Sequence, residues 1–320
     1  MIVPQVSIVV PNFNKASFIG QTISSLIAQG KLAETIVVDD CSADDSVSII
    51  ERAERECPSI RLVRAPQRLG GSGCRDLGLS VARGEYVMFV DSDDLLSEWC
   101  CNGRLEAARA MPDHDMRVFP MSVFRDRPGA PVDQWVPQRG DHLRHFLAHR
   151  LDWHTMQPLW RTSSVRAIGG FDPAFPRLQD PEVHTKALLQ GARVALFPDM
   201  PPDCHYRIAA ERHEADASGL AERHVVGSIL FYERFAPQVR PERLPLLSGT
   251  LLACQGMLLQ WWRTGRLDPA TLDAMNARLL DTCRVRWHVP VLAWSFKAQR
   301  LSPTHIPGLR WATKRLLGLP

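Results

Sequence analysis

Short apolar runs that lack polar alternation place the strongest constraint on how this chain folds. Three of them occupy residues 6–10 (VSIVV), 35–39 (TIVVD) and 86–90 (YVMFV), and a further strand is expected at 60–65 (IRLVRA). Stretches with helical spacing of apolar residues separate these runs. A strand without polar alternation is buried on both faces, which is typical of a parallel sheet between helices. The sequence therefore predicts an α/β fold with a mostly parallel central sheet and flanking helices.

The rest of the 320-residue chain divides into a less regular middle and a helical end. A proline-rich stretch at residues 125–141 is expected to be a surface loop. A helix at about residues 181–190 and a strand near Val194 follow it. Beyond about Gly219 the chain becomes helical and rich in Leu, Arg and Trp. We therefore expect an α/β domain over residues 1–218 and a mainly helical C-terminal region over residues 219–320.

Charge and cysteine usage narrow the class of protein. A formal net charge of +3 is too small to indicate nucleic-acid binding across the whole surface. The eight cysteines are scattered and form no CxxC pair, which favours reduced thiols and a cytoplasmic protein. The N-terminus resembles no signal peptide, since Pro4 interrupts its apolar run, and no apolar segment approaches the roughly 20 residues that a membrane span needs.

Three polar segments follow predicted strands, and two of them are acidic. They are PNFNK after the first strand, DDCSADD after the second and DSDD after the fourth. The carboxyl ends of parallel strands meet at one sheet edge, where ligands bind in such folds. Asp91 and Asp93 are two residues apart, so in an extended segment they point to the same side and can bind Mg²⁺ or Mn²⁺. Asp94 is expected to face away and cap a helix near Ser97; alternatively, all three acids only favour a helix N-terminus.

The other two signals at this edge are Asp40 and a glycine-rich turn. Asp40 follows the second strand far enough to accept a hydrogen bond from the N–H of a nucleobase; the alternative is an ordinary turn acid. The turn at residues 68–76 (RLGGSGCRD) precedes a helix expected to start near Arg75. Its glycines would let backbone N–H groups approach a phosphate, but a simple tight turn explains them equally well.

Four segments in this order resemble the family 2 glycosyltransferases of the GT-A fold. They are VSIVVPNFNKASFIGQTISSLIAQ, IVVDDCSADDS, GGSGCRDLGLSVARGEYVMFVDSDD and GGFDPAF…LQDPEVHTKALLQG, and they cover roughly the first 210 residues. The resemblance implies a Rossmann-like catalytic domain that binds a nucleotide-sugar, most commonly a UDP-sugar. It also implies transfer of the sugar to an acceptor hydroxyl with inversion of the anomeric centre, typically in bacterial surface polysaccharide or glycoconjugate synthesis.

The resemblance assigns roles residue by residue. Pro11 and Phe13 would lie against the base and Asp40 would hydrogen-bond it. Arg75 would approach the diphosphate. The metal motif DxD would comprise Asp91, which also contacts the donor, and Asp93. The catalytic base, from the family's ED motif, would be Asp180.

Alternatives remain for several of these residues. Asp180 before Pro181 also reads as a helix N-cap, and Gln179 replaces the usual Glu. In CHYRIAAERH (204–213), family members place a Tyr and an Arg, and sometimes a His, over the diphosphate or metal. His205 or His213 would then be a further metal ligand, although a lone histidine is more often structural. Arg68 stands where Asn is usual in the family.

The C-terminal tail has no acid after Asp281. Its seven basic residues are Arg284, Arg286, Lys297, Arg300, Arg310, Lys314 and Arg315. The segment HIPGLRWATKRLLGL suggests a short amphipathic helix that either packs on the enzyme or lies on an anionic membrane surface, which would place the protein on the inner face of the cell membrane. The earlier segment LLACQGMLLQWWRTG reads as a buried helix or a contact between copies in a homo-oligomer.

Two other functions fit parts of the sequence. A sugar-phosphate nucleotidyltransferase also combines a nucleotide fold with acidic metal ligands, but it predicts a glycine-rich basic loop after the first strand, which PNFNKASF lacks. A catalytically inactive GT-A-like binding module is the third reading. The acceptor of a glycosyltransferase would be a glycan, a lipid-linked sugar or a protein, and no motif selects among them.

Overall fold

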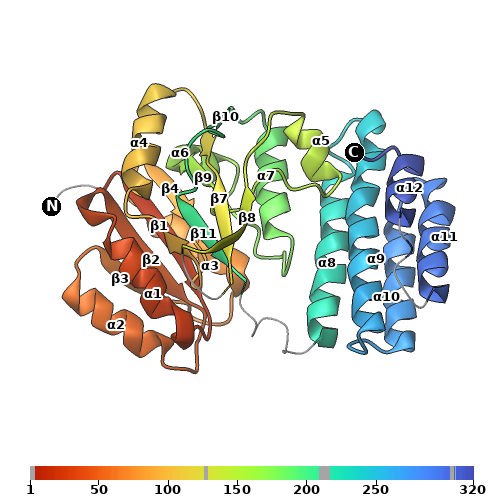
Figure 1. Ribbon diagram of the computed structural model, residues 1–320, viewed down its shortest axis with the longest axis horizontal. Helices are drawn as coiled ribbons and strands as arrows, with labels where there is room; N and C mark the ends of the chain where they lie inside the picture. Colours follow the sequence, from red (N-terminus) through yellow and green to blue (C-terminus); the bar gives the residue numbers. More distant parts are fainter. Residues whose placement is uncertain (1–3, 126–128, 209–216, 303–305, 307) are drawn as a thin grey trace. The chain divides into compact units, whose positions relative to one another are not determined.

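The computed structural model describes residues 4–125, 129–208, 217–302, 306 and 308–320 (Figure 1). The chain forms two compact units that are interleaved along the sequence. The first unit comprises Met1–Gly140, Asp152–Ala174 and Lys186–Ala209, and the second comprises Asp141–Leu151, Phe175–Thr185 and Ala210–Pro320. Two short segments that precede residue 210 therefore belong with the C-terminal helices.

In the described part of the chain, the first unit contains a seven-stranded sheet in the order β10-β6-β9-β4-β1-β2-β3. Its strands are β1 (Val6–Asn12), β2 (Ala33–Asp39), β3 (Ile60–Arg64), β4 (Tyr86–Phe89), β6 (Met116–Val118), β9 (Pro158–Arg161) and β10 (Val194–Leu196). The four strands β3, β2, β1 and β4 run parallel, whereas β9 is antiparallel to both β4 and β6. The predicted α/β fold with a mostly parallel sheet is confirmed.

Helices cover both faces of this sheet, as the lack of polar alternation predicts. On one face Val37 of β2 packs in a core with residues of α1 (Ala16–Ile27), α2 (Ser46–Glu56) and α4 (Cys100–Ala110). On the other face Ile36 and Val38 pack against α3 (Gly70–Val81). Alternate residues of the same strand thus enter two separate cores, which explains why every position of β2 is buried.

Helix α3 lies unusually close to the sheet. A Cβ atom at Gly78 would lie 2.3 Å from Cγ1 of Val9, so only glycine permits this approach. The helix begins at Gly70, which has φ of +72°. The prediction that it starts near Arg75 was wrong, because the glycines form its first turns instead of a preceding loop. Arg75 therefore lies on a rigid helical turn.

A smaller sheet in the order β5-β11-β7-β8 completes the first unit. Its strands are β5 (Leu95–Leu96), β7 (Met121–Phe124), β8 (Pro131–Trp135) and β11 (Cys204–Arg207). Strand β8 falls inside the stretch predicted to be a surface loop. It is a mostly exposed edge strand that pairs with β7, and an edge position tolerates Pro131 because its missing N–H would face solvent.

The second unit is helical, as predicted for the C-terminal region. Its helices are α5 (His142–Leu147), the first part of α7 (Gln179–Leu189), α8 (Ala217–Phe235), η3 (Pro241–Leu247), α9 (Ser248–Arg263), α10 (Pro269–Thr282), α11 (His288–Leu301) and α12 (Leu309–Leu316). Helix α9 packs against α8, α10 and α11 and buries Leu251, Leu258 and Leu259. The apolar segment from residue 251 is thus a buried helix of this unit.

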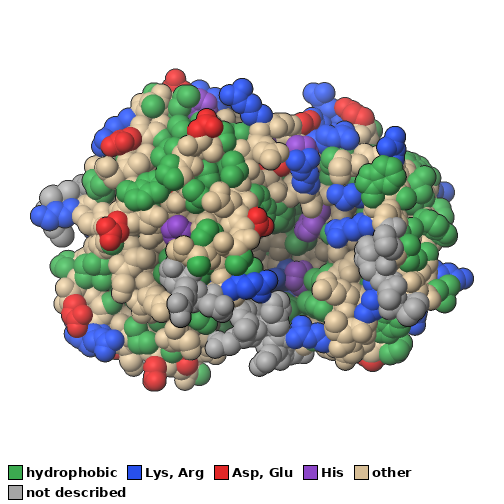
Figure 2. All heavy atoms as spheres, viewed as in Figure 1, with side chains coloured by type: hydrophobic (Ala, Val, Ile, Leu, Met, Phe, Trp, Pro, Cys, Tyr) green, Lys and Arg blue, Asp and Glu red, His purple; other side chains and the backbone are tan. Residues whose placement is uncertain are grey.

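The surface charges, the cysteines and the helices each bear on the sequence predictions. Figure 2 shows acidic and basic side chains interspersed over the visible face of the first unit. All eight cysteines lie in the described part of the chain and all are free thiols. None of the described helices combines the length and the apolar character needed to cross a membrane.

Candidate active site

The loop after β2 has one aspartate that ties two strands together. The Oδ1 atom of Asp39 accepts hydrogen bonds from Asn12 Nδ2 (2.8 Å) and Ser42 Oγ (2.6 Å), and its Oδ2 atom accepts one from the Ser42 N–H. Asn12 ends β1 and Asp39 ends β2. Asp39 therefore fixes the geometry of this sheet edge, which leaves Asp40 as the acid that faces the predicted ligand.

Asp40 is held by the start of α3. Its carboxylate accepts hydrogen bonds from the backbone N–H groups of Leu69 (2.6 Å) and Gly70 (3.1 Å) and from Arg68 Nε (3.1 Å). The acid thus satisfies two N–H groups at the helix N-terminus, where a negative charge is favoured. Burial, followed by the nearby charge of Asp40, raises the pKa of the Cys74 thiol to about 12, so this thiol stays protonated.

Phe13 presents an aromatic face at the same edge. The ring is 36% exposed, and the guanidinium carbon of Arg68 lies 3.3 Å from its centroid. Pro11, two residues earlier in β1, is half-buried. The predicted base-binding residues Pro11, Phe13 and Asp40 therefore lie at the ends of two neighbouring parallel strands, and Arg68 contacts both the ring and the carboxylate.

The loop after β4 places its aspartates opposite cationic side chains. Asp91 pairs with Arg75 of α3, and Asp93 Oδ2 accepts a hydrogen bond from Lys15 Nζ at 2.8 Å. Asp93 is almost fully buried, whereas the Asp91 side chain is 25% exposed. Residues distant in the sequence therefore offset the charges of these aspartates.

Lys15 is a functional candidate that sequence reasoning missed. It follows β1 directly, in the PNFNK segment, and therefore emerges at the same sheet edge as the aspartates after β4. Its position as the last residue before α1 directs attention to helix capping, yet it makes no side-chain cap. The available signal in the sequence was its place in the PNFNK segment, because that segment follows the first predicted strand at the sheet edge where the acidic segments also lie.

The three acids of the DSDD segment form a cluster suited to a hard cation. One carboxylate oxygen from each of Asp91, Asp93 and Asp94 lies within 4.8 Å of the others. Mg²⁺ and Mn²⁺ prefer oxygen ligands of this kind and complete their shells with water or phosphate oxygens. The donor set therefore fits the predicted divalent metal.

Asp94 does not cap a helix, which corrects the sequence prediction. It is fully buried, and its Oδ1 atom accepts a hydrogen bond from the backbone N–H of Arg207 at 2.8 Å. The chain after Asp94 enters the short strand β5, and α4 begins only at Cys100. Because β5 pairs with β11, Asp94 instead joins the DSDD loop to the smaller sheet.

Arg207 holds the DSDD loop through hydrogen bonds to Asp93 and Asp94. Its Nε donates to the carbonyl oxygen of Asp93 and its Nη2 to Gln21 Oε1, both at 2.8 Å. The buried guanidinium also lies 5.1 Å from the ring centroid of Phe18 and 4.7 Å from that of Phe124. The family pattern suggested an Arg that closes over the diphosphate, whereas this Arg is committed to positioning the loop.

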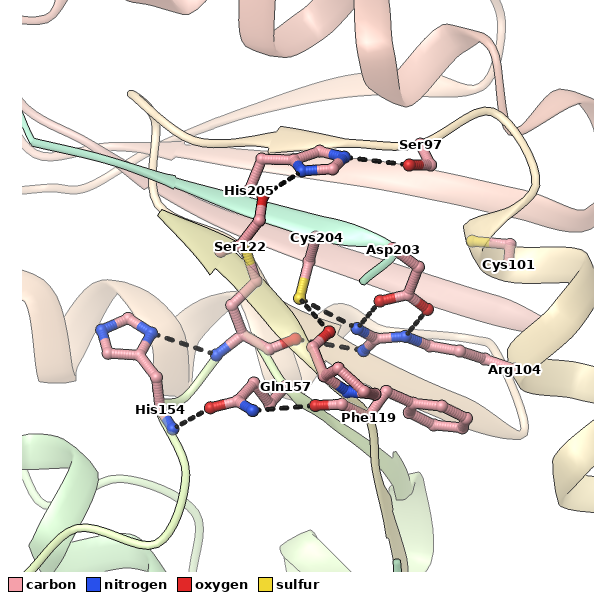
Figure 3. A network of polar contacts seen from close by, with 12 residues as sticks. Ser97, Cys101, Arg104, Phe119, Ser122, His154, Gln157, Asp203, Cys204 and His205 are labelled. Carbon is pink, nitrogen blue, oxygen red and sulfur yellow. Dashed lines mark hydrogen bonds and ion pairs between the residues drawn. The ribbon is translucent and has the colours of Figure 1, made fainter. Parts of the chain in front are cut away.

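His205 is not part of the carboxylate cluster, contrary to its prediction as a metal ligand. Both ring nitrogens are hydrogen-bonded to serine hydroxyls: Nε2 to Ser97 Oγ (2.9 Å) and Nδ1 to Ser122 Oγ (2.6 Å) (Figure 3). Burial holds the pKa of His205 below its usual value. A neutral histidine that connects β11, β7 and the segment after β5 is a structural residue. His213, the other candidate, lies outside the described residues.

A buried ion pair anchors β11 next to this histidine. Two hydrogen bonds of 2.7 and 2.6 Å join Arg104 of α4 to Asp203 (Figure 3). Arg104 Nη1 also donates to the Met156 carbonyl oxygen. Both charged side chains are essentially inaccessible to solvent. The pair fixes the start of the strand that carries His205 and Arg207, and so acts on the site indirectly.

Asp180 belongs to the second compact unit, whereas the other described site residues belong to the first. Helix α7 begins at Gln179, so Asp180 is its second residue and not an N-cap before Pro181. The preceding Leu178 has φ of +64°, and its carbonyl oxygen accepts the Glu182 N–H. Asp180 is half-buried and shares the first turn with Glu182, where acids are favoured by the helix dipole. Its role as a base stays a prediction.

These observations define a class of protein. A parallel sheet covered by helices, with an acid after β2 and clustered aspartates after β4, is the arrangement of a GT-A nucleotide-sugar transferase domain. Residues 7–152 match the model of the family described as glycosyl transferase family 2. The matched segment, a little under half of the 320-residue chain, is thus similar to a glycosyltransferase family.

Curated relatives match this chain over only part of their own length. The chain is 40% identical over 93 residues to the succinoglycan biosynthesis protein ExoO of Rhizobium meliloti, covering 29% of this chain and 26% of that protein. It is 34% identical over 202 residues to the poly(ribitol-phosphate) beta-N-acetylglucosaminyltransferase TarS of Staphylococcus aureus, covering 60% of this chain and 34% of that one. The matched segments thus cover about a third or less of the length of these relatives.

Solved structures agree on the fold. A crystal structure of residues 1–349 of S. aureus TarS matches with a TM-score of 0.66 and 17% identity, covering 98% of this chain and 92% of that one. The same TarS segment in complex with UDP-GlcNAc matches with a TM-score of 0.58 and 18% identity, with the same coverage of both chains. A mannosyltransferase from Pyrobaculum calidifontis in complex with GDP-Man and Mn²⁺ matches with a TM-score of 0.50 and 20% identity, covering 88% and 86%. At these identities the likeness shows the fold alone.

Proposed function

We propose that this protein transfers a sugar from a UDP-sugar to an acceptor hydroxyl, with inversion of the anomeric centre. The observation that carries the proposal is the way β1 joins the two acidic loops. Asn12 at its end contacts Asp39 at the end of β2, and Lys15 just beyond it contacts Asp93 after β4. One sheet edge therefore combines an aromatic face, an acid that accepts N–H groups and a metal-binding cluster, which are the elements that a nucleotide diphosphate requires.

The comparisons support the donor and suggest the acceptor class. TarS, which shares the fold, has been crystallised with UDP-GlcNAc and with UDP. The names of TarS and ExoO refer to a ribitol phosphate polymer and to succinoglycan. We therefore propose a glycan or lipid-linked glycan acceptor and a role in the synthesis of a surface polysaccharide.

Asp91 and Asp93 would hold Mn²⁺ or Mg²⁺, which when bound stabilises the negative charge of the departing diphosphate. Arg75, which pairs with Asp91 in this structure, is the side chain placed to contact the same oxygens once the diphosphate is present. Lys15 would likewise shift from Asp93 toward the ligand. Both cations are already at the site, so little reorganisation accompanies the growth of charge on the leaving group.

Asp180 would accept the proton of the acceptor hydroxyl as that oxygen attacks the anomeric carbon. Substitution of Asp180 by Asn should lower sugar transfer by about 10²–10⁴-fold while leaving UDP affinity unchanged, because a base acts only on the acceptor. Asp281→Asn, which removes an exposed acid of the same unit, is the matched control. Normal transfer by the Asp180 variant would assign the base to another residue.

Donor binding is tested most directly by calorimetry with UDP, GDP and dTDP in the presence of Mn²⁺. We expect UDP to bind with a metal dependence that Asp91→Asn abolishes. Failure to bind any of the three nucleotides would overturn the proposed function. Nucleotide binding without transfer or donor hydrolysis for any sugar nucleotide would favour an inactive binding module instead.

A further inference from the structure

One side of helix α11 exposes large apolar side chains at a regular spacing. Trp287, Trp294 and Leu301 are 55%, 52% and 76% exposed and follow one another at seven-residue intervals. Seven residues are close to two helical turns, so the three side chains lie on one side of the helix. The opposite side, which includes Leu292 and Phe296, is buried within the unit.

Helix α12 packs against α11 and also exposes large apolar side chains. Thr313 Oγ1 of α12 donates a hydrogen bond to Ser295 Oγ of α11 at 2.9 Å, so the two helices are packed together. Trp311 and Leu316 of α12 are 64% and 56% exposed. The space-filling view shows apolar and basic side chains side by side over these helices (Figure 2). We call the exposed surface of these two helices and of Trp287, the residue before α11, the α11–α12 face; its large apolar side chains are Trp287, Trp294, Leu301, Trp311 and Leu316.

The segment that forms the α11–α12 face carries charges of one sign. Residues 282–320 contain seven basic residues and no acid. Lys297 is exposed on the same side of α11, three residues after Trp294. Arg310 and Arg315 are exposed on α12, whereas Arg300 is paired with Asp273. Burial and the nearby positive charges of Arg310 and Arg150 lower the pKa of Lys314, which reflects the crowding of cations there.

We propose that the α11–α12 face docks on an anionic lipid surface. Tryptophan and basic side chains together are the combination that an acidic headgroup region accommodates, with rings at the headgroup level and ammonium groups on the phosphates. Each basic residue near such a surface strengthens binding about fivefold. A second copy of this chain is the poorer occupant, because two copies related by symmetry would bring the same positive charges together.

Vesicle co-sedimentation of the full chain tests this proposal. We expect binding to vesicles of equal parts phosphatidylcholine and phosphatidylglycerol, weak binding to pure phosphatidylcholine, and loss of binding at high salt. The double variant Trp287→Ser/Trp294→Ser should bind at least about tenfold more weakly. Trp99→Ser, which removes an exposed tryptophan of the first unit, should bind like the unsubstituted protein.

Three outcomes would overturn the proposal. One is equal binding to both kinds of vesicle or to neither. Another is binding that the double variant retains in full. The third is a dimer in sedimentation velocity that the double variant converts to a monomer, which would show that the face pairs two copies. Because the substituted residues are exposed, circular dichroism of the variant should match that of the unsubstituted protein.

A second, independent observation concerns Arg68, and the inference from it rests on the proposed donor site. With its guanidinium carbon 3.3 Å from the Phe13 centroid, Arg68 leaves no space for another flat group on that face. Its Nε simultaneously donates to Asp40 Oδ2 at 3.1 Å. The base of the donor is proposed to bind in the same way, with its plane stacked on Phe13 and an N–H directed at Asp40. We infer that Arg68 competes with the base for Phe13 and Asp40 and must swing away when the donor binds.

The side chain is free to make that movement, because it is 54% exposed. Arg68→Met should therefore bind UDP about five- to twentyfold more tightly and show a lower KM for the donor with kcat little changed, since a cation–π contact and a surface ion pair together are of that size. Arg64→Met, which removes an exposed arginine of β3, is the control and should change neither quantity.

The outcomes separate this inference from the proposed function. Tighter binding by Arg68→Met supports it. Equal or weaker binding by this variant, with UDP bound normally by the unsubstituted protein, overturns the inference and indicates that Arg68 contacts the nucleotide directly. If neither protein binds UDP, GDP or dTDP, the proposed function fails and the inference fails with it.

Discussion

The loops after β2 and β4 each present adjacent aspartates at the same sheet edge, but they hold them by different means. Asp39 and Asp40 accept hydrogen bonds from backbone N–H groups and neutral side chains, with one arginine added. Asp91 and Asp93 instead pair with a guanidinium and an ammonium group. Backbone donors cannot leave, whereas long cationic side chains can turn from a carboxylate to a phosphate.

This difference suggests that the loop after β2 recognises the base of the donor and that the loop after β4 binds the reacting diphosphate. We call them the recognising loop and the reactive loop. A carboxylate fixed by backbone donors has a defined direction, which suits selection of a base. Carboxylates whose charges are already offset by cationic side chains can accept a metal–diphosphate complex without leaving buried charge uncompensated. The four predictions below test this division of roles.

The largest effect is expected at the reactive loop. Asp91→Asn should reduce sugar transfer by at least about 10³-fold, because it removes one metal-binding oxygen and releases Arg75 from its ion pair. Thermal stability should change little, since the side chain is partly exposed. Initial rates with saturating donor and metal measure the effect. Asp45→Asn, an exposed acid in the loop after β2, should retain full activity.

Asp94 tests whether the third acid of the cluster is structural. Asp94→Ala leaves the Arg207 N–H without its buried acceptor and should lower the free energy of unfolding by about 3 kcal/mol. Urea unfolding measures the change. Manganese affinity, measured on the folded variant, should fall less than in Asp91→Asn. If the variant loses manganese but keeps its stability, Asp94 is a metal ligand and not a support.

Asp40 tests the recognising loop. Asp40→Asn keeps an acceptor for one backbone N–H but loses the charge that Arg68 and the α3 N-terminus favour. We expect UDP affinity to fall about tenfold, corresponding to one charge-assisted hydrogen bond. The same substitution at Asp39 should reduce stability more than affinity, because Asp39 faces Asn12 and Ser42. A larger affinity loss at Asp39 would reverse the roles of the two acids.

Most of the fold could be predicted from the sequence because each central strand is apolar on both faces. The sheet-edge positions of Asp40, Asp91 and Asp93 could be predicted for the same reason, because each of these acids follows the end of a recognisable strand. What the sequence could not give were contacts across long separations: Lys15 with Asp93, and Arg207 with Asp94, are separated by 78 and 113 residues. Local capping patterns favoured a cap for Asp94, but strand pairing between β5 and β11 overrode them.

The smallest predicted effect concerns His205, which connects β11 and β7 to the segment after β5. Burial keeps the folded-state pKa of His205 below the ordinary value of 6.5, so the unfolded chain binds its proton more readily. The contribution of His205 is therefore fully present above pH 6.5 and is lost as pH falls through the folded-state pKa. Thermal unfolding between about pH 7 and pH 5 should show a decline in midpoint that His205→Gln reduces. Because β11 also carries Arg207, we expect manganese affinity to weaken with acidification in the unsubstituted protein more than in this variant. An identical pH dependence in both proteins would mean that the loop after β4 is held without the histidine, and would leave Arg104 and Asp203 as the groups that fix β11.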